Sequence, residues 1–68
     1  MTESREEPRY QVGDVVSVTE TIASAYTGRV GRIVHRVVSR YARTLDKYTV
    51  AFADGDTETF WDIQLRRP

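Results

Sequence analysis

Apolar and polar residues alternate over short runs along most of the chain, and Gly or Asp-Gly separates these runs. In segments rich in Val and Thr, this spacing predicts β-strands, because successive side chains of a strand point to opposite faces. The sequence carries no sustained apolar stripe of the kind an amphipathic helix needs. We therefore predict an all-β fold with strands over 15–18, 29–40, 47–53 and 57–61. A single short 3-10 turn at 63–65 then leads into a last short strand.

The second predicted strand has the least regular alternation. Gly31 lies inside it, where glycine predicts either a β-bulge or the close approach of another backbone. Ile33 and Val37 share one face, and the opposite face carries Val34, Val38 and three arginines, namely Arg32, Arg36 and Arg40. A bulge would bring members of both sets inward. If the alternation holds, the three arginines form a row about 13 Å long on one face.

The tripeptide Asp54-Gly55-Asp56 predicts the turn of a β-hairpin, because Gly tolerates positive φ and Asp can bond its own backbone. Loop length decides the register. A three-residue loop with a glycine bulge pairs Tyr48 with Phe60, which places Phe60 in the core and leaves Trp61 partly exposed. A two-residue loop pairs Tyr48 with Trp61 instead. We favour the first alternative.

A chain of 68 residues and 7.8 kDa is enough for one small domain. We predict a flexible, charged tail over residues 1–9 and a five-stranded antiparallel barrel over 10–68, because closure removes exposed sheet edges. The chain has no Cys and a single His, His35, which excludes thiolate metal sites and His clusters. We expect no catalytic residues, no metal and no cofactor. The sequence shows neither a long apolar span nor a signal peptide, so we expect a cytoplasmic protein that does not enter a membrane.

The residues in these strands resemble an SH3-like barrel over residues 10–67. One similar group is the Tudor and KOW modules. The matching positions are Tyr48, Val50, Phe52, Asp54, Gly55, Glu58, Phe60, Leu65 and Arg66. Tudor cages for methylated side chains add an aromatic and an Asn at the hairpin turn. This chain has Asp54-Gly55-Asp56 there and contains no Asn, so the resemblance does not extend to that cage.

A second similar group contains accessory proteins of electron transport. They are photosystem I subunit IV, the ferredoxin-docking subunit S of the photosynthetic NDH complex, and the barrel of the nitrile hydratase beta subunit. The matching positions are Tyr26, Gly28, Gly31 and Ile33. This resemblance implies a small subunit that docks on a larger protein complex.

The formal net charge of zero conceals a segregation of charge along the chain. Residues 29–47 carry six basic residues and one acidic residue, whereas residues 54–62 carry four acidic residues and no basic one. We expect a non-catalytic module that binds an acidic or polar protein partner through its arginines and exposed aromatics. The predicted contact residues are Tyr26, Arg29, Arg32, Arg36, Arg40, Tyr41 and Trp61.

Several alternatives remain open from the sequence. The basic strand favours nucleic-acid binding of the KOW or Tudor kind as a second function. Without a ligand, the same arginines would pair with the acids of the neighbouring hairpin, and Trp61 would be the half-buried lid of a small barrel. A small core also gains from burial in a second copy, so a homo-oligomer is a further alternative.

Overall fold

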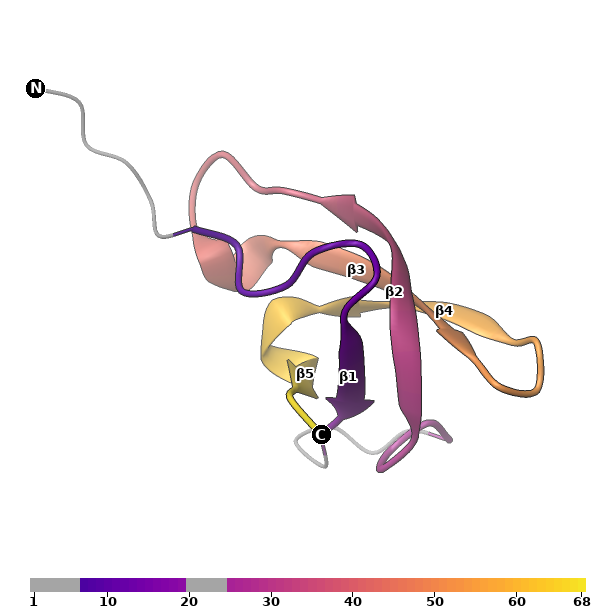
Figure 1. Ribbon diagram of the computed structural model, residues 1–68. Helices are drawn as coiled ribbons and strands as arrows, with labels where there is room; N and C mark the ends of the chain where they lie inside the picture. The colour runs from indigo at the N-terminus through magenta and orange to yellow at the C-terminus, as the bar shows by residue number, and fades with distance from the viewer. Residues whose placement is uncertain (1–6, 20–24) are drawn as a thin grey trace, which may run out of the picture.

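The computed structural model describes residues 7–19 and 25–68, which form five strands and two short 3-10 turns. In chain order these are β1 (Val15–Val18), β2 (Val30–Val37), η1 (Arg43–Leu45), β3 (Lys47–Phe52), β4 (Thr57–Trp61), η2 (Asp62–Gln64) and β5 (Leu65–Arg66) (Figure 1). The predictions of an all-β fold and of a 3-10 turn before the last strand are confirmed. Within the predicted tail and first loop, residues 1–6 and 20–24 lie outside the described residues.

The strands form one antiparallel sheet in the order β4-β3-β2-β1-β5. β4 and β5 are its two edges, yet only the three residues of η2 connect them. A flat sheet would separate these edges by about 19 Å, because neighbouring strands lie about 4.8 Å apart. The sheet therefore curls (Figure 1). No ladder joins β4 to β5 in the described part of the chain, so the sheet is not closed into the barrel that we predicted.

The core lies on one face of the curled sheet, which we call the inner face. Alternate strand residues supply it, as expected for strands with one buried face. Val16 and Val18 are both buried, and Tyr10 joins them where the chain enters β1. Among the described residues, the buried apolar ones are Tyr10, Val16, Val18, Ile33, Tyr48, Val50, Phe52, Phe60 and Leu65. We call the opposite side of the sheet the outer face.

The β3–β4 hairpin has the register that we favoured. Tyr48 pairs with Phe60, and Phe60 is buried, whereas Trp61 is 42% exposed. The Phe52 N–H donates to the Asp56 carbonyl at 2.8 Å, which closes a three-residue loop with Gly55 at φ 95°. Glycine adopts this φ without strain, so the position of Gly55 determines the length of the loop. The loop length in turn sets the register, which turns Trp61 away from the core.

A β-bulge interrupts β2 at Val34, three residues beyond the glycine where the sequence suggested one. Ile33 pairs with Val50, but His35 then pairs with Thr49, so that Val34 has no partner on β3. The bulge reverses the facing of every later residue of β2. It brings Arg36 opposite Tyr48 on the inner face and leaves Val34 and Val37 exposed. As expected for a bulge, one member of each predicted face points inward, Ile33 and Arg36, while the valines of both faces stay exposed.

Gly31 serves the other purpose that its position suggested, the close approach of two backbones. A Cβ atom at this residue would lie 2.5 Å from Cγ1 of Val50 and 2.7 Å from the Ala51 carbonyl oxygen. Its φ is negative, so the requirement is for space and not for an unusual conformation. Glycine at this point lets the neighbouring strands β2 and β3 approach each other closely.

Candidate functional site

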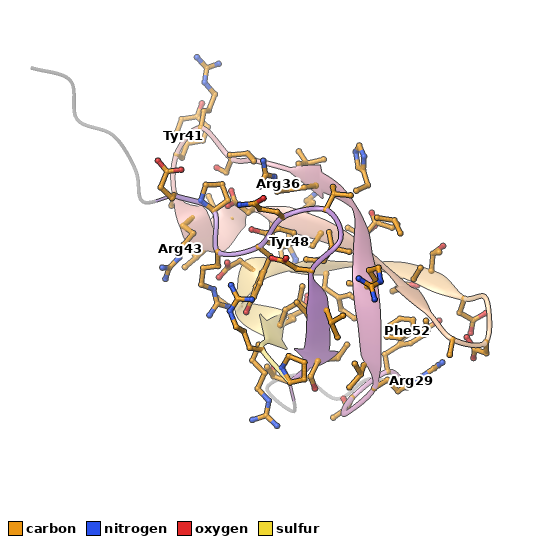
Figure 2. The ribbon with its side chains drawn as sticks, in the orientation of Figure 1. Arg29, Arg36, Tyr41, Arg43, Tyr48 and Phe52 are labelled. Carbon is orange, nitrogen blue, oxygen red and sulfur yellow. The ribbon has the colours of Figure 1, made fainter. Side chains whose placement is uncertain are left out.

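The structure separates the predicted contact residues. Figure 2 places Tyr41 and Arg29 at opposite ends of the molecule, with Arg36 between them. Because of the bulge, Arg32 and Arg36 project from opposite faces of the sheet, and Arg40 lies beyond the end of β2. The predicted row of three arginines on one face is therefore not formed.

Arg29 and Tyr26 belong to a cluster beside the turn of the β3–β4 hairpin, and Figure 2 shows Arg29 near Phe52. Tyr26 is half-buried and stacks on Phe52, with 5.0 Å between ring centroids and 18° between ring planes. The Arg29 guanidinium lies 4.6 Å from the centroid of Phe52, and its Nη2 donates to Asp54 at 2.8 Å. Tyr26 thus packs against the core, whereas we had predicted it to be one of the exposed aromatics.

Arg32 and Arg36 both bind the segment that precedes β1. Nη1 of Arg32 donates to the Gly13 carbonyl at 2.6 Å, and Nη1 of Arg36 donates to the Tyr10 carbonyl at 2.9 Å. These are bonds to backbone and not to the acids of the hairpin. Their guanidinium groups fix the chain entry beside β2.

Arg40 and Tyr41 lie in the connection between β2 and η1. Both side chains are exposed, and Tyr41 is the most exposed large apolar residue described, at 79%. The connection is shaped from inside by Asp46, which is fully buried and accepts the Ser39 N–H at 2.7 Å.

Trp61 lies in a different place, on the outer face of β2, β3 and β4. Cross-strand pairing groups the outer side chains into rows: Val37, Lys47 and Trp61 in one, and His35, Thr49 and Thr59 in the next. Arg32, Ala51 and Thr57 form a third row. Within these three strands, all of them fully described, the outer positions hold no carboxylate. The outer face is therefore a mixed apolar and hydroxyl surface with a positive charge.

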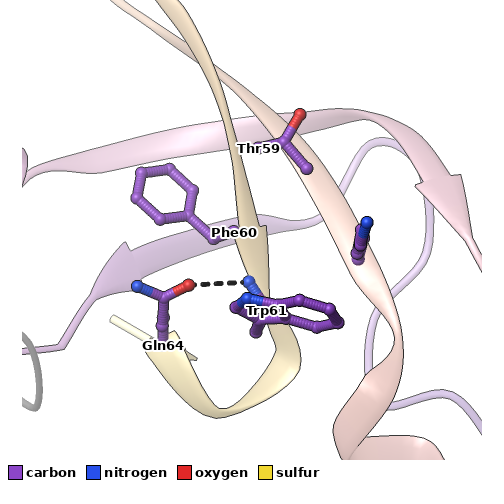
Figure 3. A pocket seen from close by; sticks show the side chains of 5 residues that line it. Thr59, Phe60, Trp61 and Gln64 are labelled. Atoms are coloured by element: carbon purple, nitrogen blue, oxygen red, sulfur yellow. Dashed lines mark hydrogen bonds between the residues drawn. The ribbon is translucent and has the colours of Figure 1, made fainter.

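A hollow of about 170 Å³ opens beside Trp61 at the edge of the outer face. Its lining residues are Lys47, Thr59, Phe60, Trp61 and Gln64 (Figure 3). Nζ of Lys47 lies 4.8 Å from the centroid of the indole, a cation-π distance, so the ammonium leans across β4. The Trp61 N–H donates to Oε1 of Gln64 at 2.8 Å, which ties the end of β4 to η2.

Arg9 is a contact that the sequence did not predict, because it was assigned to the tail. Its Nε donates to Oδ2 of Asp62 at 3.0 Å, and its Nη2 donates to the carbonyls of Asp62 and Leu65, each at 2.9 Å. Asp62 is 1% exposed. We call this arrangement the Arg9 clasp. Its members are 53 and 56 residues apart, so no local pattern in the sequence could have revealed it.

The titratable groups with shifted pKa values lie outside the outer face. Burial raises the pKa of Tyr10 and of Tyr48 above the ordinary tyrosine value. The Asp56 N–H, and after it the Arg29 guanidinium, lowers the pKa of the Asp54 carboxyl. These shifts follow from packing and turn geometry, and the three groups do not face a common cavity among the described residues.

Comparison with known proteins found no match: no protein family, no curated protein and no solved structure resembles the chain closely enough to be assigned. Among residues 7–19 and 25–68 no three side chains of His, Asp or Glu are grouped so as to hold a metal ion. The same residues include no helix that is long and apolar enough to span a membrane. The class that the structure defines is a small all-β protein with one curled antiparallel sheet.

Proposed function

We propose that the protein is a non-catalytic binding module of the SH3-like class and that it docks an acidic protein partner on its outer face. The proposal of SH3-like identity is supported by the five antiparallel strands and by the 3-10 turn η2 before β5. The single observation that carries the proposed function is the position of Trp61. It is a large aromatic, 42% exposed, beside a hollow and under the ammonium of Lys47.

The outer face combines exposed apolar area with positive charge, and both favour an acidic protein partner. Trp and exposed valines gain free energy when a partner covers them, and exposed Trp is enriched at the centres of protein interfaces. Val37 is 54% exposed and lies in the same row as Lys47 and Trp61. Lys47 and Arg32 supply positive charge without an acid on that face, so an acidic partner is favoured.

This proposal moves the contact surface away from most of the arginines first expected to form it. Arg29 is paired with Asp54, and Arg36 is directed to the inner face. A protein that binds nucleic acid contacts several phosphates of the nucleic-acid backbone, which needs several arginines on one surface. The break in the arginine row therefore favours a protein partner over the KOW-like alternative.

The test is an NMR titration of 15N-labelled protein with three probes: a glutamate-rich peptide, its lysine-rich counterpart and a single-stranded DNA oligonucleotide. We expect only the glutamate-rich peptide to shift the amides of Lys47 and Thr59 and the indole N–H of Trp61. Shifts caused only by the DNA would replace the proposal with nucleic-acid binding. No shift with any probe at about 1 mM would refute a binding role for this face.

Two variants identify the surface, and each has a matched control. Trp61→Ala and Lys47→Glu should each weaken the peptide complex about tenfold or more, a loss typical of a central interface residue. Ile63→Ala and Arg66→Glu change an exposed apolar residue and an exposed cation outside the three rows of β2, β3 and β4. Equal losses in the variants and their controls would contradict the assignment.

A further inference from the structure

The two edges of the sheet differ in whether their outward backbone groups are satisfied. At the β5 edge, the Leu65 carbonyl accepts bonds from Nη2 of Arg9 at 2.9 Å and from the Tyr10 hydroxyl at 3.1 Å. β5 is also only two residues long. Side chains of the chain itself thus close that edge.

The β4 edge lacks such a cover in the described part of the chain. The bonds from Phe52 N–H to the Asp56 carbonyl and from Asp62 N–H to the Asp46 carbonyl fix which residues bond across the hairpin. In an antiparallel pair, bonded and non-bonded pairs alternate. Since the register of β3 and β4 runs without a shift, Thr57 and Thr59 belong to the non-bonded pairs. Each therefore directs its N–H and its C=O away from β3.

Strand β4 also carries few of the devices that protect a sheet edge. Its sequence, Thr57-Glu58-Thr59-Phe60-Trp61, contains no Lys and no Pro and has one charge, and Thr, Phe and Trp favour extended backbone. The β3–β4 hairpin also projects beyond the other strands (Figure 1). On its other side β4 pairs with no described strand.

We propose that an extended segment of the partner protein adds to β4 as an antiparallel strand, with acidic side chains on the outer face. This inference rests on the proposed function and specifies how the partner binds. Added residues opposite Thr57 and Thr59 would share their face, since paired residues of antiparallel strands point the same way. Acidic side chains there lie next to the Lys47 ammonium, which already leans across Trp61.

The alternation of faces along β4 also determines which residue the partner segment carries between its two acidic residues. Glu58 pairs with Val50 and faces the other way from Thr57 and Thr59. A residue of the added strand beside Glu58 is therefore neutral or basic, because like charges directly opposite are destabilising. The backbone N–H of Trp61 already donates to the Gln64 side chain, so the added strand forms its last backbone bonds with Thr59. The expected signature is two acidic residues separated by one residue that is not acidic.

The test uses a capped peptide of about nine residues, a common strand length, in which glutamate and threonine alternate. One derivative is N-methylated at the glutamates and a second at the threonines. Residues opposite Thr57 and Thr59 donate toward β4, so methylation of the glutamates removes the donors and methylation of the threonines does not. We expect the unmodified and threonine-methylated peptides to slow hydrogen exchange at Thr57 and Thr59 about tenfold or more, and the glutamate-methylated peptide to have no effect.

The reciprocal change is Thr59→Pro. Its N–H faces away from β3, so proline there removes no backbone bond of the hairpin and is tolerated at an edge. The hydroxyl contact between Thr49 and Thr59 at 2.9 Å is lost with proline and with alanine alike. We expect it to weaken peptide binding at least about tenfold, with Thr59→Ala as the control that keeps the N–H. Circular dichroism checks that both variants fold. Thr57→Pro provides a second edge variant if Thr59→Pro does not fold.

The outcomes distinguish the two proposals. Equal binding of both methylated peptides, with shifts at Trp61 but unchanged exchange at Thr57 and Thr59, overturns strand addition and leaves the proposed function standing. No response at any residue overturns the proposed function itself. If the free protein is a dimer in analytical ultracentrifugation and protects both amides, a second copy occupies the edge and strand addition by a partner is wrong.

Discussion

The Arg9 clasp leads to a quantitative prediction for Arg9→Ala. The substitution removes an ion pair and two hydrogen bonds to carbonyls, and it leaves the 1% exposed Asp62 carboxylate without its counter-ion. Breaking a buried ion pair costs about 3–5 kcal/mol. The Arg9 side chain is 35% exposed, so solvent screens part of this interaction. We expect a loss of about 2 kcal/mol in the free energy of unfolding.

That loss is large for so small a protein. A chain of 68 residues has a total stability of about 3–10 kcal/mol at the usual value per residue. With a urea dependence of about 1 kcal/mol per molar, the unfolding midpoint should fall by about 2 M. Circular dichroism and the fluorescence of Trp61, the one tryptophan of the sequence, give two independent probes of the transition.

The control is Arg66→Ala, an exposed arginine next to Leu65 in the sequence, for which we expect a change within about 0.5 kcal/mol. A second background isolates the cause. Asp62→Asn should destabilise the native chain, but it should stabilise the Arg9→Ala variant because it removes the uncompensated buried charge. The reasoning is refuted if Arg9→Ala behaves like Arg66→Ala, or if Asp62→Asn lowers stability equally in both backgrounds.

Further predictions concern packing and ionisation. Gly31→Ala should lower stability by about 1–3 kcal/mol in urea unfolding, because the new Cβ meets Val50 and a carbonyl oxygen at distances that rigid backbone cannot relieve. The raised pKa of Tyr48 means that its stabilising effect is complete below pH 10 and is lost as the pH rises through the higher folded value; Tyr48→Phe should therefore make the unfolding free energy fall less steeply above pH 10. In an NMR pH titration, the pKa of the Asp54 carboxyl should lie below its ordinary value, and Arg29→Ala should raise it only in part, because the stronger cause is a backbone N–H. The corresponding contribution to stability is present above the ordinary carboxyl pKa and lost as the pH falls through the lowered value.

The strands and the hairpin register could be predicted because their causes are local. Alternation within each run and one glycine in the Asp54-Gly55-Asp56 turn determine which side chains of β3 and β4 face the core. The exposure of Trp61 followed from the same register.

The bulge at Val34 has no local signal, because valine is an ordinary strand residue and the extra residue depends on how β2 meets β3. Missing it placed Arg32 and Arg36 on one face and produced an arginine row that the fold does not have. The Arg9 clasp was not predicted for a similar reason. A charged segment without periodicity looks like a solvated tail until the distant residues that it contacts are known.

The outer face became recognisable as a site only in three dimensions. Lys47 and Trp61 are far apart in the chain, and the pairing of β3 with β4 brings them together. The sequence indicated an exposed tryptophan, but not the cation that lies over it or the absence of carboxylates at the outer positions of β2, β3 and β4.

The Arg9 clasp also brings the two ends of the folded unit together. Nη2 of Arg67 donates to the Arg9 carbonyl at 3.1 Å, so a side chain from the C-terminal segment reaches the backbone at Arg9. The described N-terminal segment and the C-terminus both lie away from the projecting β3–β4 hairpin (Figure 1). Such a unit can be inserted into a surface loop of another protein, or circularly permuted with a short linker, while the β4 edge stays accessible.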